Sequence, residues 1–172
     1  MTKDLDVVGI GSMAVDRMHR APRLLGSDEK GMLHPLDDGS PVENRVGGVV
    51  LNHLGWAATL GLRTGIFGRQ PRDEGGRFLQ SAMARAGIEA HLSDEGEATT
   101  VCEIFVDDEG ARSIYMAPAA TSGTTAAHVR DEHTSFIERA RWVTTEVSQL
   151  PLEAALEAMK IAREKGCRTL VD

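Results

Sequence analysis

Apolar residues follow two different spacings along the chain, one typical of helices and one typical of strands. Leu51, Leu54 and Ala58 recur at steps of three and four residues after a pair of glycines, which predicts a helix within 46–62. The same spacing predicts three further helices, at 73–88, 126–140 and 151–166. Short runs rich in β-branched residues predict strands between the helices, at 5–11, 62–68, 141–148 and 167–172.

Two segments break this alternation of strands and helices. In 100–117 apolar and polar residues alternate, the pattern stops at Asp-Asp-Glu-Gly and then resumes, which predicts a β-hairpin. The segment 18–45 is rich in glycine, proline and aspartate and is compatible with a short irregular hairpin. The rest predicts an α/β fold, with a central, mostly parallel sheet and helices on both faces. Both irregular segments would leave the C-terminal ends of strands, where open α/β sheets bind ligands.

Composition and charge narrow the possible partners. The chain has 172 residues, 41% of them hydrophobic and 26% charged, with a net charge of −7. Lys and Arg never form a run longer than two, which argues against nucleic acid or an anionic membrane as the main partner. No apolar run approaches a membrane span, and acidic residues interrupt the N-terminal apolar run, unlike a signal peptide. Cys102 and Cys167 lack metal-ligand spacing, so we expect buried, reduced thiols in a cytoplasmic protein.

The first glycine pattern has two interpretations. Gly9–Ala14 reads GIGSMA and matches the loose dinucleotide-binding pattern G-x-G-x-x-A, which would indicate an oxidoreductase. That site needs a helix directly after the glycines and an acidic residue after the second strand, and this sequence predicts neither. Alternatively, the glycines open a crevice into which Asp16 points, where its carboxylate would accept hydrogen bonds from two hydroxyls of a polyol. A third reading is an aspartate that caps its own loop backbone.

The double glycine Gly47–Gly48 is either a plain turn into the helix or a place where something approaches the backbone closely. Four stretches bear on this choice: VGIGSMAVD, VGGVVLNHLGWAATLGL, GIFGRQPRDEGGRFLQSAMARAGI and VDDEGARSIYM. In this order and at these separations they resemble the N-terminal half of a ribokinase-like carbohydrate kinase of the PfkB family. The resemblance covers essentially all of residues 1–172.

The resemblance implies roles for individual residues. Asp16 would grip sugar hydroxyls, Gly47 and Gly48 would let the sugar approach the backbone, and Asn52 would reach a sugar hydroxyl. Glu146 is the nearest carboxylate to a further sugar contact of the family. The stretch containing Gly68, Asp73 and Gly76 would shape a turn and start the second helix. Segments of about 18–45 and 99–116 would form a small antiparallel β-lid, which makes dimer contacts in some members.

Several positions depart from the family pattern. Ala14 stands where many sugar-binding members carry asparagine, and Val49–Leu51 replace smaller residues. PAAT, from Pro118, stands where the family often has Pro-Gly-Ala-Asn. These departures concern the identity of the sugar and leave the class of protein unchanged.

The implied activity is transfer of the γ-phosphate of ATP to a hydroxyl of a sugar or nucleoside, with ATP and Mg²⁺ expected for the full-length enzyme. The sequence contains no G-x-x-x-x-G-K-[ST] loop and no GAGD-like stretch with the family's catalytic aspartate. Asp172 resembles an aspartate of the next strand rather than the catalytic base. We therefore expect no catalytic or cofactor-binding residue in this chain, the C-terminal part of the fold to be missing, and residues 1–172 to be inactive alone. The alternative is a non-catalytic module that binds a sugar or dimerises through the lid.

The remaining candidate residues favour structural roles. His19, His34 and His53 are scattered, and His128 and His133 are predicted to lie on a solvated helix, so no metal site is expected. Trp56 and Trp142 are predicted to belong to the core.

Overall fold

The central sheet forms the scaffold of the molecule. A computed structural model describes residues 3–172. Within them, five strands make up this sheet, in the spatial order β5 (Glu89–Ser93), β4 (Thr64–Arg69), β1 (Leu5–Ile10), β8 (Ala140–Thr145) and β9 (Arg168–Val171). Every neighbouring pair in this sheet is parallel, which confirms the predicted architecture. Strand β5 was not predicted, because its residues are largely exposed and polar.

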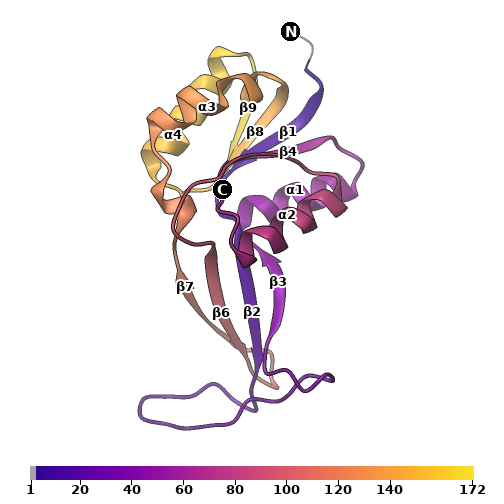
Figure 1. Ribbon diagram of the computed structural model, residues 1–172, viewed down its shortest axis with the longest axis vertical. Coiled ribbons are helices and arrows are strands. Elements are labelled where there is room, and N and C mark those ends of the chain that lie inside the picture. The colour runs from indigo at the N-terminus through magenta and orange to yellow at the C-terminus, as the bar shows by residue number, and fades with distance from the viewer. Residues whose placement is uncertain (1–2) are drawn as a thin grey trace.

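Helices cover the sheet on both faces, as predicted (Figure 1). Helices α1 (Val49–Thr59) and α2 (Glu74–Ala86) pack on one face, and α3 (Ala126–Glu138) and α4 (Leu152–Glu164) pack on the other. Consecutive residues of β4 serve opposite cores: Ile66 packs with α1 and α2, while Phe67 packs with α3 and α4. Both side chains are fully buried, as expected for a parallel strand covered on two faces.

The start of α2 explains the spacing of Gly68, Asp73 and Gly76 noted in the sequence. Asp73 is the N-cap, and its Oδ1 accepts a hydrogen bond of 2.7 Å from the Gly76 amide. Its other oxygen accepts one of 2.8 Å from the Thr99 amide, which fastens the helix to the segment before β6. A Cβ on Gly76 would overlap the carbonyl oxygen of Pro71. The predicted role in shaping this turn is confirmed.

A second, smaller sheet projects from the central one (Figure 1). Its four strands lie in the order β3 (Glu43–Gly47), β2 (Ala14–Arg20), β6 (Thr100–Val106) and β7 (Arg112–Ala117). Strands β6 and β7 form the predicted hairpin, which turns at Gly110 with φ of 85°. The sheet is mixed, not purely antiparallel as expected, since β2 and β6 run in the same direction. A long connection between β2 and β3 lies at its far end.

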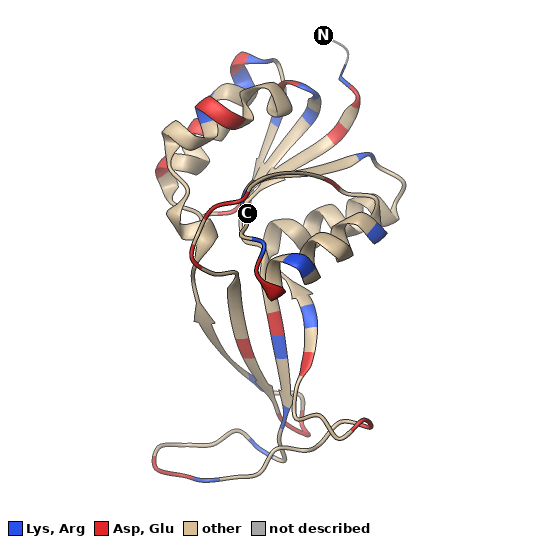
Figure 2. Ribbon diagram, viewed as in Figure 1, with Lys and Arg blue, Asp and Glu red and all other residues tan. Residues whose placement is uncertain are grey.

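Charged residues are distributed over both sheets and the helices. Figure 2 shows Lys and Arg scattered among Asp and Glu rather than gathered on one element. Many pair with each other: Arg139, for example, contacts both Asp4 and Glu89 at 2.7 Å. Among the described residues, no helix combines the length and apolar character needed to cross a membrane.

The predicted core is correct for the cysteines and wrong for the tryptophans. Cys102 and Cys167 are both buried and free. Trp56 is 72% exposed and Trp142 is 41% exposed. On α1 the buried residues Val50, Leu51 and Leu54 define the inner face, and Trp56 lies outside it. The ring of Trp142 instead lies 5.3 Å from the guanidinium of Arg168 on the neighbouring strand β9.

Candidate functional site

Three chain segments meet where the two sheets join. Strand β1 ends at Ile10, and the chain passes through 11–13 directly into β2 of the small sheet. Beside this crossing, β3 ends at Gly47 and α1 begins at Val49. The third segment follows β8, whose last residue is Thr145. This convergence brings four of the five predicted site residues into one neighbourhood: Asp16, Gly47, Gly48 and Glu146.

Gly47 lies directly against the carboxylate of Asp16. A Cβ on Gly47 would overlap both carboxylate oxygens, so a larger residue here would displace them. Asp16 is only half-buried, and its cross-strand neighbour on β6 is Cys102. Burial raises the pKa of Asp16, while a hydrogen bond from the Cys102 thiol acts in the opposite direction. Asp16 therefore has a partly accessible carboxylate that can accept hydrogen bonds and lies against the backbone of Gly47.

Gly48 is required for a different reason. Its φ is +102°, which L side chains rarely adopt, and a Cβ would overlap the backbone carbonyl of Ser12. Gly48 is also the N-cap of α1 but has no side chain to cap it. The Oγ of Ser12 accepts a hydrogen bond of 2.9 Å from the Val49 amide and so caps the helix from outside. Close approach to these glycines therefore involves the chain's own Asp16 and Ser12.

Glu146 holds the crossing segment in place. It is 1% exposed, and its Oε1 accepts a hydrogen bond of 3.0 Å from the Ser12 amide. Its Oε2 accepts from both the amide and the hydroxyl of Ser148 and from the amide of Gln149. Burial raises the pKa of Glu146, but the hydrogen bonds from Ser148, Gln149 and Ser12 together outweigh it, and the pKa is lowered. Glu146 is thus an ionised, well-satisfied carboxylate.

Asn52 lies apart from the other four residues. It is exposed on the first turn of α1, and it lines a groove of about 330 Å³ between α1 and α2. Trp56 and Val46 line the same groove, whereas Asp16 and Glu146 do not.

Ser12 is the site residue that sequence reasoning missed. It is fully buried and connects Glu146 to the start of α1. Its position inside GIGSMA carries a signal, because the two glycines let other atoms come close. A Cβ on Gly11 would meet Val50 of α1 and lie 2.9 Å from the Cγ of Glu146. The glycine pattern therefore serves close packing between β1, α1 and Glu146.

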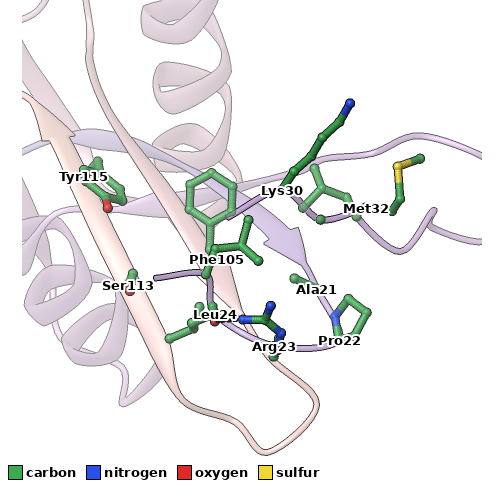
Figure 3. A pocket seen from close by; sticks show the side chains of 12 residues that line it. Ala21, Pro22, Arg23, Leu24, Lys30, Met32, Phe105, Ser113 and Tyr115 are labelled. Carbon is green, nitrogen blue, oxygen red and sulfur yellow. Dashed lines mark hydrogen bonds between the residues drawn. The ribbon is translucent and has the colours of Figure 1, made fainter. Parts of the chain in front are cut away.

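A separate apolar pocket lies at the far end of the small sheet (Figure 3). Its volume is about 570 Å³, and it is enclosed by residues 21–33 and the β6–β7 hairpin. Leu24, Met32, Phe105 and Tyr115 contribute most of its large side chains. None of the predicted site residues lines it.

Comparisons with known proteins define the class of protein. Residues 4–172 match the family described as pfkB family carbohydrate kinase, so the chain belongs to that family. The predicted family and fold are thereby confirmed. A 5-dehydro-2-deoxygluconokinase of Shouchella clausii is 27% identical over 99% of this chain and 51% of its own length. A bifunctional ribokinase/ribose-5-phosphate isomerase A of Fructilactobacillus sanfranciscensis is 30% identical over 96% of this chain and 30% of its own length.

Solved structures agree on the fold. Ribokinase of Arabidopsis thaliana, complexed with ribose and ATP, superposes with a TM-score of 0.78 at 18% identity. Adenosine kinase of Sinorhizobium meliloti gives a TM-score of 0.76 at 21% identity. The chain covers 54% and 56% of these two structures. It therefore spans about half the length of the 5-dehydro-2-deoxygluconokinase and of these two kinases.

Proposed function

We propose that the protein containing this chain transfers the γ-phosphate of ATP to a hydroxyl of a small polyol, and that residues 1–172 supply its sugar-binding portion. The observation that carries the proposal is the accessible Asp16 carboxylate beside Gly47, at the junction of the two sheets. An ionised carboxylate accepts two hydrogen bonds from neighbouring hydroxyls, which is the pattern a sugar offers. Family membership supports the reaction class.

The other site residues complete this proposal. Gly47 makes room for the Asp16 carboxylate and Gly48 for the carbonyl of Ser12, and Glu146 positions Ser12 and the start of α1. A ligand would approach the two glycines from the side of Asp16. Asn52, on the first turn of α1, would contact the ligand only after its side chain turns away from the groove that it now lines. The small sheet would close over the ligand as a lid. The lid would comprise segments 18–45 and 99–116. The catalytic base and the sites for ATP and Mg²⁺ would lie in residues outside this chain.

The acceptor is proposed to be a sugar or sugar acid rather than a nucleoside. Several relatives bear the name 5-dehydro-2-deoxygluconokinase, and each aligns with nearly the whole of this chain. The likeness to adenosine kinase is one of fold only, at 21% identity. We place the protein in the cytoplasm, in keeping with two free, buried cysteines and an ATP-dependent reaction.

The test combines binding and turnover. Calorimetry on residues 1–172 would use a panel of ketoses, aldoses, sugar acids and nucleosides. Coupled ADP release would be measured on this chain and on a chain extended by the C-terminal half of a relative. We expect sugar-dependent turnover only from the extended protein. Turnover by residues 1–172 alone would contradict the proposal that the catalytic base and the ATP site lie outside this chain.

Asp16→Asn tests directly whether the Asp16 carboxylate binds the sugar. Loss of a charged hydrogen bond costs roughly 1.5–3 kcal/mol, so kcat/KM should fall about tenfold to a hundredfold in the extended protein. Asp131→Asn removes the same charge from an exposed position on α3, outside the site and the lid, and should leave kcat/KM unchanged. Equal kinetics for Asp16→Asn and the unchanged protein would remove Asp16 from the site.

One observation favours a second function, dimerisation through the small sheet. On the face of the small sheet that carries the apolar pocket of Figure 3, strand β7 presents Tyr115, which is 67% exposed. A second copy of this chain would cover this surface. Sedimentation of the unchanged chain and of Tyr115→Lys tests it: a dimer that the substitution dissociates supports the function, and a monomer at all concentrations excludes it.

A further inference from the structure

Three histidines and a glutamate gather where α3 packs beside the edge strand β5. His128, Glu132 and His133 belong to α3, and His91 belongs to β5. Each of the three α3 residues offers a ligand atom, and these atoms all lie within 4.8 Å of one another. The cluster shares no residue with the proposed sugar site.

The burial of this cluster contradicts the sequence prediction. His128 and His133 were expected on a solvated helix, but His133 is fully buried and the side chain of His128 is 8% exposed. The inner face of α3 consists of Val129, His133, Phe136 and Ile137, spaced by three or four residues. His133 therefore occupies a core position and packs against Phe67 of β4, with ring centroids 5.4 Å apart.

Each of the two α3 imidazoles keeps one buried nitrogen without a hydrogen-bond partner in the part of the chain that the structure describes. These are Nδ1 of His128 and Nε2 of His133. Buried polar atoms are nearly always satisfied, and leaving one unpaired is costly.

The other ring nitrogen of each residue already has a hydrogen-bond partner, which holds the ring in one orientation. Nδ1 of His133 lies 2.9 Å from Nδ1 of His91, and Nε2 of His128 lies 2.9 Å from Oγ of Ser93. The hydroxyl of Ser93 also donates to Glu132. Metal-bound histidines characteristically hold their second nitrogen this way, which fixes the ring and its tautomer. Both partners lie on β5, so they would connect the cluster to the sheet.

We propose that His128, Glu132 and His133 bind a Zn²⁺ ion, with His91 and Ser93 as positioning residues. Two imidazoles and one carboxylate form a donor set that suits zinc, with water as the fourth ligand. Glu132 is 47% exposed on its side chain, so the ion would enter from the solvent side. The bound ion would fix the side chains of three residues on α3, and His91 and Ser93 of β5 would hold the two imidazoles through their hydrogen bonds.

Metal titration tests the proposal on the 172-residue chain after chelator treatment. Calorimetry with Zn²⁺, checked by competition with a chromogenic chelator, should give one equivalent with a Kd in the micromolar range or tighter. Co²⁺ should produce the visible absorption of a four-coordinate site, and Zn²⁺ should displace it. Zn²⁺ should also raise the Tm, and excess chelator should reverse the rise.

Glu132→Gln is the decisive variant, since its exposed position keeps the fold intact. It should weaken Zn²⁺ binding at least tenfold and change the Co²⁺ spectrum. Asp131→Asn removes one charge from the neighbouring exposed position and should bind as the unchanged chain does. His128→Gln, a second variant, should abolish stoichiometric binding.

Two results would overturn the proposal. One is the absence of saturable Zn²⁺ binding by the unchanged chain. The other is equal affinity in the unchanged chain, Glu132→Gln and His128→Gln, which would assign the metal to other histidines such as His34 and His53.

Discussion

The two sheets of this chain bury their residues in different ways. In the central sheet, neighbouring residues such as Ile66 and Phe67 are buried on opposite faces by two pairs of helices. In the small sheet, Cys102 and Ile104 form a minor cluster with Ala14, while β7 is largely exposed. Most of the central sheet is therefore covered on both faces, whereas the small sheet keeps one surface available to a ligand or a second copy. The candidate site lies where the two meet.

The largest difference between the sheets should be seen on removing an aromatic side chain. Phe67→Ala leaves a cavity in a fully buried core position and should lower the free energy of unfolding by about 4 kcal/mol. Tyr115→Ala removes an aromatic ring from the exposed strand β7 and should cost less than about 1 kcal/mol. Urea denaturation measures both. Similar losses for the two variants would mean that the small sheet contributes as much to stability as the central one.

The junction of the sheets should be almost as sensitive as the core. Gly48→Ala places a Cβ against the Ser12 carbonyl at a φ of +102° and should cost roughly 3 kcal/mol. Gly61→Ala is the matched control, with a φ of +87° but no atom within 4 Å of the added Cβ. The control should lose only about 1 kcal/mol in the same denaturation experiment. Equal losses would attribute the effect to backbone conformation alone.

Glu146 should give the junction a specific dependence on pH. Because its pKa is lowered in the folded state, its ionised form stabilises the fold above pH 4.5, and this contribution disappears as the pH falls below 4.5. Glu146→Gln should cost about 2 kcal/mol at pH 7 and less at pH 4. Thermal melts at the two pH values report the difference. A constant loss at both pH values would contradict the assigned hydrogen bonds to an ionised carboxylate.

Asp16 should show the smallest effect on stability, and with the opposite sign. Burial raises its pKa, so the ionised form is mildly destabilising above that raised value. Asp16→Asn should therefore raise the free energy of unfolding slightly at pH 7. The gain should vanish at pH 3, where the aspartate is protonated. A residue that binds ligand at some expense of stability behaves this way, whereas a loss at pH 7 would indicate a structural role.

The elements predicted best from sequence are those whose burial follows a regular period. The helices and the strands β1, β4 and β8 fall in this group, because their burial leaves a clear apolar pattern. The apolar run at 167–172 also predicted β9, although that strand is largely exposed. Strand β5 and the pairing of β2 with β6 were not predicted. Their residues are polar or half-exposed, and the β2–β6 partners are about 86 residues apart.

The candidate site was predicted in part. Motif spacing selected Asp16, Gly47, Gly48 and Glu146, which the fold brings together, and also Asn52, which it places in a separate groove. Ser12 was missed because its importance comes from two hydrogen bonds between distant segments. The histidine cluster was missed because α3 was expected to be solvated, whereas His133 occupies a buried position on it.

The order of strands in the central sheet has a consequence for how the chain folds. Strand β1 pairs on one side with β4, some 57 residues later, and on the other with β8, where Leu5 opposes Ala140 across 135 residues. Closing the longer loop costs more chain entropy, and residues of β8 leave the ribosome well after those of β4. We expect β1 and β4 to associate first, leaving one edge of the nascent sheet open until synthesis reaches β8. Pulsed hydrogen exchange during refolding would then show early protection in β4 and late protection in β8, and the reverse order would contradict this sequence of events.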